Sequence, residues 1–271
     1  MRHSRKLMTS REQYLCTIRT RSRVVTFGRI TVLILFLAAW EISARTGLLD
    51  TFIFSSPSAL WKTLVEMTSD GSIFLHTGIT LYETLVSFLI STALGIAIAV
   101  LLWWFPLNRD ISEPYWIALN SLPKSALAPI LIVWFGNTTK SILITSVSLT
   151  IVSTILTMLN GFLSVDPDKI SLIRSFGGSK RQVLMKILLP ANVPVLMNVL
   201  KVNIGLCLIG VIIGEFLSAK AGLGYLIIYG SQIFKMNWVI LSIVILCVLA
   251  VLLYQIIQWI GKRYEHRTEE S

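Results

Sequence analysis

The side chains able to do chemistry are scattered along this sequence and form no recognisable catalytic or metal-binding motif. The histidines and cysteines are His3, His76, His266, Cys16, Cys207 and Cys247. None of these residues has metal-ligand or disulfide-framework spacing, and the chain contains neither H-E-x-x-H nor a G-x-x-x-x-G-K-[ST] phosphate loop. We therefore predict a protein that is not an enzyme, binds no metal or cofactor, and does not hydrolyse ATP itself.

Polar residues inside apolar runs are more informative, because they are costly in a membrane and are functional by default. Lys124 and Lys201 interrupt such runs, and Asn198 and Asn203 flank Lys201. Asn198 precedes Lys201 by three residues, so the two share a helix face. We expect these four residues to line a solute pathway in which an anion meets a favourable charge. The alternative is that Lys201 extends to the inner surface or pairs with a carboxylate.

Composition indicates that these residues lie in a membrane protein. The chain is 54% hydrophobic and 14% charged, whereas a soluble domain has about 25% charged residues. The apolar residues form blocks long enough to cross a bilayer. We predict an all-α integral membrane protein with six transmembrane helices, at about 28–46, 80–105, 114–135, 138–160, 191–217 and 237–260.

Several local signals refine these elements. Pro123 and Pro129 remove backbone hydrogen bonds in the third span, which predicts a kink or local unwinding. Asn137 is expected to cap the fourth span. In the external segment 47–79, Ser56 as N-cap and Pro57 at the first helical position predict a surface helix.

The first apolar block, 28–46, has a competing interpretation as a signal peptide. The basic tail 1–27 is long for one, and Glu41 interrupts the approach to a cleavage site. We therefore expect a retained helix. The chain has 24 Lys and Arg against 14 Asp and Glu, and most of the cations fall on one side if the N-terminus is cytoplasmic. The positive-inside rule then places both tails, 1–27 and 261–271, in the cytoplasm. It also explains the excess of Lys and Arg, so this excess does not indicate nucleic-acid binding.

The cytoplasmic loop 161–190, part of a permease core over 80–260, contains several signals for the starts and ends of short helices. Asp166 and Pro167 predict the start of one short helix, and Gly177-Gly178 its end. Ser179 and Gln182 have the spacing of a capping box, which predicts a second short helix that stops before Pro190.

Both short helices have an apolar face. The first would present Ile170, Ile173 and Phe176 on one side, and the second Val183, Leu184, Ile187 and Leu188. Two interpretations remain open from the pattern: these faces pack on the ends of their own spans, or they dock a soluble partner.

This loop resembles the cytoplasmic signature of binding-protein-dependent ABC importer permeases of type I. Gly177 matches the family glycine, and residues 187–190 (Ile-Leu-Leu-Pro) match its I-x-L-P ending. Ser171, Leu172 and Ile173 stand where the family has Glu-Ala-Ala, so the resemblance does not imply the usual glutamate contact to the ATPase for this chain. The similarity to the nitrate/sulfonate/taurine branch extends through the motifs at 55–57, 122–129, 134–136, 214–216 and 222–225.

The resemblance implies partners and roles. It implies a homodimer of this chain in the bacterial plasma membrane, a dimer of a separate ABC ATPase, and an external solute-binding protein. It implies that the ATPase-coupling residues are Arg174, Gly177, Gly178, Ser179, Gln182, Leu184 and Pro190. Glu215, Gly222 and Gly224 would form an external gate or turn.

The predicted function is therefore ATP-driven import of a small solute, such as a sulfonate, taurine or nitrate. The same machine could instead import a heterocyclic vitamin precursor such as the thiamine pyrimidine. An ion-coupled secondary transporter would need acidic groups or broken-helix ion sites deep in the membrane. An intramembrane protease would need paired Asp, a Ser–His pair or metal ligands there.

Overall fold

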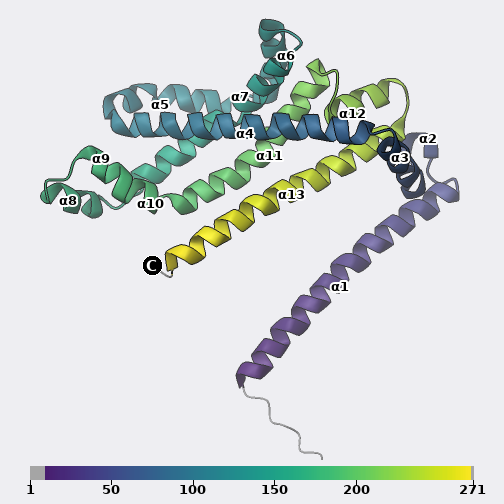
Figure 1. Ribbon diagram of the computed structural model, residues 1–271, viewed down its shortest axis with the longest axis horizontal. Helices are drawn as coiled ribbons and strands as arrows, with labels where there is room; N and C mark the ends of the chain where they lie inside the picture. The colour runs from purple at the N-terminus through teal and green to yellow at the C-terminus, as the bar shows by residue number, and fades with distance from the viewer. Residues whose placement is uncertain (1–9, 270–271) are drawn as a thin grey trace, which may run out of the picture. The chain divides into compact units, whose positions relative to one another are not determined.

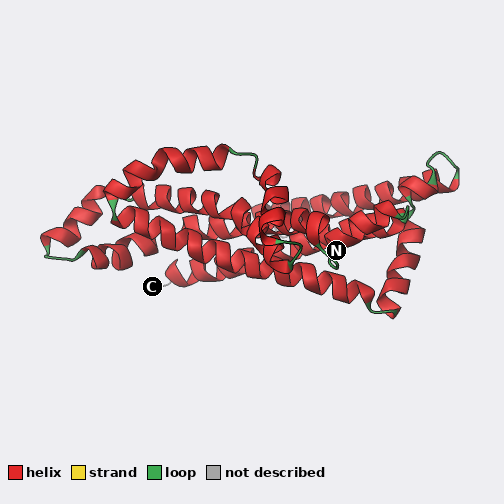
Figure 2. Cartoon of the chain, turned by 90° about the horizontal axis from the view of Figure 1, so that it is seen from above, coloured by secondary structure: helices red, strands yellow, loops and turns green. Residues whose placement is uncertain are grey.

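The computed structural model describes the backbone of residues 10–269 and the side chains of residues 24–263. This part of the chain is helical throughout, with short connecting loops and no strand (Figure 2). The side chains of His3, His266, Cys16 and all the Lys and Arg residues of the predicted tail 1–27 lie outside the described ones. The chain divides into two compact units, Met1–Thr63 and Leu64–Ser271, which we describe separately.

The first unit contains helix α1 (Ser10–Arg45), the short helix α2 (Thr51–Phe54) and the start of α3 (Pro57–Ser69). Helix α1 begins inside the predicted tail, and its apolar part, Val24–Arg45, is long enough to cross a bilayer.

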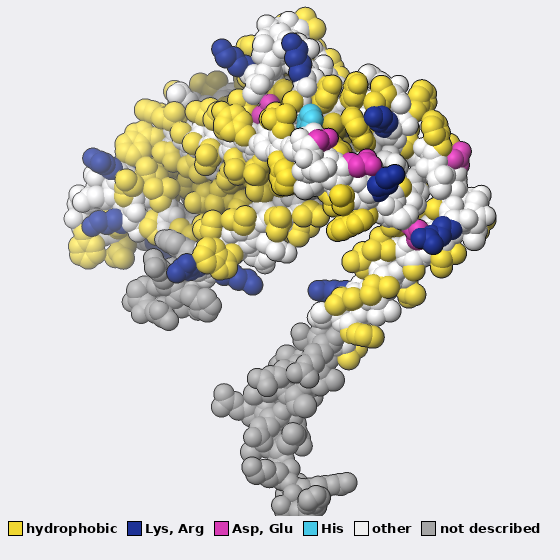
Figure 3. Space-filling model, turned by 45° about the vertical axis from the view of Figure 1, so that its right-hand side comes forward, with side chains coloured by type: hydrophobic (Ala, Val, Ile, Leu, Met, Phe, Trp, Pro, Cys, Tyr) yellow, Lys and Arg dark blue, Asp and Glu magenta, His cyan; other side chains and the backbone are white. Residues whose placement is uncertain are grey.

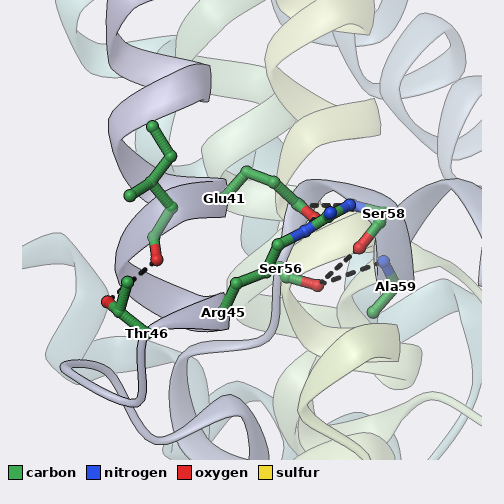
Figure 4. Close-up of polar contacts among 7 residues, drawn as sticks. Glu41, Arg45, Thr46, Ser56, Ser58 and Ala59 are labelled. Atoms are coloured by element: carbon green, nitrogen blue, oxygen red, sulfur yellow. Dashed lines mark hydrogen bonds and ion pairs between the residues drawn. The ribbon is translucent and has the colours of Figure 1, made fainter.

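The start of α3 is fixed by side-chain caps within the first unit (Figure 4). Ser56 Oγ accepts a hydrogen bond from the Ala59 N–H over 3.2 Å. Glu41 accepts one from the Ser58 N–H over 3.1 Å and pairs with Arg45 over 2.7 Å. The predicted start at Ser56 and Pro57 is therefore confirmed.

The second unit contains four long apolar helices and one bent pair. The four are α4 (Ser72–Trp104), α7 (Thr139–Leu163), α11 (Val193–Ser218) and α13 (Met236–Glu269). Helices α5 (Pro106–Ser121) and α6 (Lys124–Phe135) meet at 95° and together make the remaining candidate span. The described residues thus contain five spans, or six if the bent pair counts as one, in agreement with the predicted number.

The boundaries differ from the sequence prediction in places. Helix α4 begins at Ser72 rather than near residue 80, and the third apolar segment is helical from Pro106 rather than 114. The cap of α7 is Thr138, which forms a capping box with Ser141, and not Asn137. The hydroxyl of Thr138 reaches the first turn from the correct position, so Asn137 remains outside the helix.

The two prolines of the third span behave differently. The chain leaves the helical conformation at Leu122 and Pro123, which produces the bend between α5 and α6. Pro129, in contrast, lies inside α6, where the helix continues through it. The predicted kink or local unwinding is confirmed at Pro123, whereas at Pro129 the helix is not unwound.

Helices α4, α7 and α11 pack together as the core of the second unit. Polar side chains bridge them: Asn203 on α11 donates to Thr154 on α7 over 2.8 Å and to Thr92 on α4 over 3.3 Å. Ser146 Oγ donates to the Cys207 carbonyl over 2.9 Å. Such hydrogen bonds are a usual means of joining helices in a membrane, where burying apolar surface gives little driving force.

Small residues bring α7 and α11 close. A Cβ at Gly210 would lie 2.6 Å from the Cα of Ser146, and one at Gly214 would lie 2.9 Å from the side chain of Ile142. Gly205 on α11, in contrast, has nothing within 4 Å of a Cβ position.

The connecting helices gather at opposite ends of this bundle. Helices α8 (Pro167–Ser175), α9 (Lys180–Val183) and α10 (Leu189–Ala191) lie at one end and α12 (Leu223–Gln232) at the other (Figure 1). Hydrophobic side chains cover much of the visible surface of the second unit, and lysines and arginines gather toward its ends (Figure 3). This distribution suits a body that sits in a bilayer.

Candidate functional site

The cytoplasmic loop 161–190, which we call the coupling loop, begins with a capped helix. The Asp166 side chain accepts a hydrogen bond from the Asp168 N–H over 2.9 Å, and Pro167 occupies the first helical position. The end of α8 is a Schellman motif: the Gly178 N–H donates to the Ile173 carbonyl and the Gly177 N–H to the Arg174 carbonyl, both over 2.9 Å.

The two glycines of this turn, Gly177 and Gly178, are needed for different reasons. Gly177 has φ +76°, a left-handed conformation that side chains with a Cβ resist. A Cβ on Gly178 would lie 2.6 Å from the Ile173 carbonyl oxygen. Ser179 and Gln182 then form the predicted capping box, with the Ser179 N–H donating to Gln182 Oε1 over 2.7 Å. The predicted helix–turn–helix of the coupling loop is confirmed.

The second short helix does not stop before Pro190 as predicted. Its α-helical part, α9, passes into a π-helical turn over Leu184–Leu188, and α10 continues through Pro190 to Ala191. A proline ring clashes with the carbonyl four residues before it and has no N–H to donate. The wider turn before Pro190 moves that carbonyl away, so the chain remains helical where an α-helix would end.

The apolar faces of the two helices divide between the protein core and the surface. Val183, Leu184 and Leu188 are buried against the inner ends of α4 and α7, and Ile170 and Ile173 pack against the same cluster. Leu184 is 9% exposed, so it attaches the coupling loop to the spans. Its predicted part in coupling to the ATPase stays a prediction.

Phe176 is the exception among the apolar residues of the coupling loop. We expected it beside Ile170 and Ile173, but it lies past the last turn of α8 and is 84% exposed. Leu172, Arg174 and Gln182 are exposed as well. The surface available to a partner is therefore the outer side of α8 and its turn.

Lys180 anchors the coupling loop, a role that sequence reasoning missed. Its ammonium donates a hydrogen bond to the carbonyl of Trp104, the last residue of α4, and lies 5.5 Å from the centroids of the Trp103 and Trp104 rings. A lysine at a helix C-terminus satisfies a carbonyl that has no partner in its own helix. Residues 76 positions apart make this contact, so no local pattern could have revealed it.

At the opposite end, Glu215 forms the centre of a buried polar cluster. It is 1% exposed and accepts hydrogen bonds from Thr80 Oγ1 over 2.6 Å and from the Gly224 N–H over 2.5 Å. Thr80 Oγ1 in turn accepts from the Leu223 N–H over 2.8 Å. Glu215 thus caps the first turn of α12 from a different helix, and its negative charge suits a helix N-terminus.

The Glu215 carboxylate leaves no room for a side chain at Gly222 or Gly224. A Cβ on Gly222, whose φ is +123°, would meet the Glu215 carboxylate at 2.4 Å, and one on Gly224 would meet it at 2.8 Å. The Gly222 N–H donates to Nδ1 of His76 over 3.0 Å. The structure therefore brings together the three residues predicted as an external gate or turn, and adds Thr80 and His76 from α4.

Glu83 is a second buried carboxyl group beside Glu215. It is 2% exposed, and its Oε2 has no hydrogen-bond partner among the described residues. Glu83 lines an open, partly polar cavity of about 440 Å³, together with residues that include Asn137, Thr138 and Lys220.

The four predicted solute-pathway residues separate into two groups. Asn203 is buried within its own bundle and uses its amide for the contacts to Thr92 and Thr154. The prediction that it lines the pathway is therefore wrong, because its hydrogen-bonding capacity serves helix packing. Asn198 is exposed on α11, and Lys201 is partly exposed.

Lys124 occupies the first position of α6, directly after the bend. Its ammonium donates to Asn120 Oδ1 over 3.1 Å and to the carbonyl of Leu149 over 3.3 Å. Leu149 lies close to the middle of the 25-residue helix α7. Neither contact is to a carboxylate, and among the described residues neither Lys124 nor Lys201 forms an ion pair. Their charges are thus not neutralised within this part of the chain.

Comparisons with known proteins identify relatives along most of the chain. A probable ABC transporter permease protein of Haemophilus influenzae is 28% identical over 231 residues, covering 84% of this chain and 92% of the relative. The formylaminopyrimidine transport permease protein ThiX of Halalkalibacterium halodurans is 29% identical, covering 71% and 76%. The putative aliphatic sulfonates transport permease protein SsuC of Bacillus subtilis is 24% identical, covering 78% and 77%.

Solved structures agree on the fold. A chain of a bacterial ABC transporter that imports the polysaccharide alginate matches with a TM-score of 0.65 at 12% identity, covering 92% of this chain and 99% of that chain. A chain of the MetNI methionine ABC transporter matches with a TM-score of 0.58 at 21% identity, covering 70% and 92%.

The family described as binding-protein-dependent transport system inner membrane component matches residues 91–269. The bent third span and the coupling loop lie within this range, as do Glu215, Gly222 and Gly224 of the buried polar cluster. The fold is that of type I ABC importer permeases, and in this family a separate subunit hydrolyses ATP. The chain therefore belongs to the binding-protein-dependent transport system inner membrane components, as the non-catalytic membrane-spanning subunit of an ABC importer.

Proposed function

We propose that this permease translocates a small organic anion of the sulfonate class, with Lys124 as the charge that the solute meets inside the membrane. The observation that carries this proposal is the position of Lys124: a cation without a carboxylate partner among the described residues, at a break in a membrane-spanning helix. A lone cation inside a membrane is costly, so it is retained for a purpose.

The broken helix itself supports an anion site. Helix α6 starts at Lys124, and no side chain caps its N-terminus. The first N–H groups of a helix carry a partial positive charge. In other transporters the half-helices of broken spans point such ends at anionic groups near the bilayer midplane. The contact of Lys124 with Leu149, near the middle of α7, is consistent with this depth.

The transport machine would contain two copies of this chain, a solute-binding protein outside and the ATPase inside. The exposed stripe of α11, with Asn198, Val202, Ile209 and Phe216, is one surface free to face a second copy. ATP binding would move the coupling loop as a rigid body, because its apolar faces and Lys180 attach it to the inner ends of the spans. Small movements at such an attachment can select between two packed arrangements of the helices.

The experiment is ATP-dependent uptake into vesicles that contain the permease, its ATPase and its binding protein. We expect uptake of taurine or a short alkanesulfonate, and continued uptake after the proton gradient is collapsed. Uptake that disappears with the gradient and ignores ATP would contradict the importer mechanism.

A second solute class is favoured by one observation. The relative with the highest percentage identity among those described above is a formylaminopyrimidine permease, whose solute is a neutral heterocycle. Uptake of such a pyrimidine, unaffected by removal of the Lys124 charge, would replace the anion proposal. Ligand screening of the solute-binding protein that works with this permease would decide between the two classes directly.

A further inference from the structure

The inner end of helix α4 carries a groove that the transport cycle described above does not use. Its volume is about 350 Å³, and its lining is almost entirely apolar. The walls come from the last turns of α4 and from the start of the second half of the coupling loop: Val100, Leu101, Trp104, Phe105, Arg181, Leu184 and Met185. The groove therefore lies between a membrane span and the segment that transmits motion from the ATPase.

The groove is located at the membrane surface on the cytoplasmic side. Helix α4 is a span of 33 residues that ends at Trp104, and the coupling loop adjoins this end. Tryptophan and other aromatic residues are enriched where the hydrocarbon region meets the headgroups. Leu101, Phe105 and Met185 are each more than half exposed in this groove, so an apolar occupant would cover surface that otherwise faces water or headgroups.

Arg181 gives the groove its only charge. Its side chain is exposed and makes no hydrogen bond or ion pair with another described residue. Its neighbour Lys180 is already engaged with the Trp104 carbonyl and the two tryptophan rings. An arginine guanidinium binds phosphate through two parallel hydrogen bonds, which makes it better suited than lysine to hold a phosphate group.

We propose that this groove binds an anionic glycerophospholipid of the cytoplasmic leaflet. One acyl chain would lie against Leu101 and Met185, and the phosphate would meet the guanidinium of Arg181. Both parts of the lipid are needed: the apolar walls select an acyl chain, and the single cation at the rim selects a negative headgroup. Because Leu184 and Met185 belong to the π-helical turn of the coupling loop, the bound lipid would also stabilise the attachment of this loop to α4.

The experiment measures the lipids that remain bound to the permease–ATPase complex after gentle detergent extraction from membranes of mixed phosphatidylglycerol and phosphatidylethanolamine. Native mass spectrometry counts them. We expect wild type to retain phosphatidylglycerol above its share of the membrane. Arg181→Gln should reduce this retention about fivefold, the effect of one cation at an anionic surface.

Two further variants test the two parts of the site. Met185→Gln keeps the side-chain length but makes one wall polar, and should also reduce retention. Lys186→Gln removes a charge of the same sign from the adjacent residue, which does not line the groove, and should leave retention unchanged. Thermal unfolding of each complex confirms that the variants are folded.

Three results would overturn the proposal. One is equal phosphatidylglycerol retention in wild type, Arg181→Gln and Met185→Gln. Another is an equal loss in Lys186→Gln and Arg181→Gln, which would indicate a general attraction to basic residues. The last is a loss of ATPase association in Arg181→Gln with unchanged lipid retention, which would assign the groove to the ATPase. None of these outcomes depends on which solute is transported.

Discussion

The carboxylate of Glu215 on α11 accepts a hydrogen bond from the backbone N–H of Gly224 on α12 over 2.5 Å, in a site where Glu215 is 1% exposed. This contact joins the end of a membrane span to the helix that follows it. It also restricts both glycines at the start of α12, because a Cβ on Gly222 would overlap the same carboxylate. At this end of the permease, the Glu215 carboxylate is therefore tightly packed against the backbone at the start of α12.

Gly222→Ala should destabilise the protein by about 1–3 kcal/mol, because the new methyl group meets the Glu215 carboxylate and the backbone holds φ +123°. Thermal unfolding of the purified complex would show a lower midpoint. Gly205→Ala is the matched control, since a Cβ there has nothing within 4 Å. Equal midpoints for the two variants would disprove the packing argument.

Glu215→Ala should cost about 1–3 kcal/mol for each buried partner left without an acceptor, here the Gly224 N–H and the Thr80 hydroxyl. Glu83→Gln should be much milder, because Glu83 Oε2 has no hydrogen-bond partner in the structure that could be lost. Unfolding midpoints compare the two. A larger loss in Glu83→Gln would show that the Glu83 charge, and not the cap of α12, dominates this cluster.

Gly177→Val should weaken ATPase co-purification and uncouple uptake from ATP. A β-branched residue resists the φ of +76° that the turn requires. Gly177→Asn provides the comparison, because asparagine enters the left-handed region more readily. We expect coupling to be largely retained in the asparagine variant. Normal coupling in the valine variant would remove the turn from the mechanism.

Phe176→Ala should weaken binding of the ATPase about tenfold without lowering the unfolding midpoint of the permease. Its side chain is 84% exposed, and large aromatic anchors carry much of the energy of an interface. Ile173→Ala should do the reverse, because Ile173 packs against the core of its own chain. Quantitative co-purification and thermal unfolding separate the two effects. An undiminished ATPase affinity in Phe176→Ala would exclude this residue from the docking surface.

Lys124→Met should reduce uptake of an anionic solute about tenfold while leaving the complex assembled, since the anion loses a charge-assisted contact. Lys201→Met tests the other cation of the predicted pathway in the same assay. Uptake kinetics that match wild type in Lys201→Met, with a defect in Lys124→Met, would limit the pathway to the broken helix. Unchanged uptake in both variants would contradict an anion site at either lysine.

The local signals of the sequence were sufficient for much of the architecture. Apolar length predicted the spans, and the caps and glycines of the coupling loop predicted its two helices, because these features depend on residues a few positions apart. The bend at Pro123 was predictable for the same reason. The continuation of the helix through Pro129 and Pro190 was not, because neighbouring backbone adjustments decide whether a proline breaks a helix.

The tertiary structure decided which side chains are covered. Helical periodicity placed Phe176 beside Ile173, yet Phe176 is exposed. Its position near Lys201 in an apolar run put Asn203 in the solute pathway, yet Asn203 joins three helices of its own bundle. The pairs Lys180–Trp104 and Glu215–Gly224 likewise follow from how the ends of separate helices meet. The sequence by itself determines which residues share a helix face. Which face is buried, and which polar group finds a partner there, depends on helices brought together from distant parts of the chain.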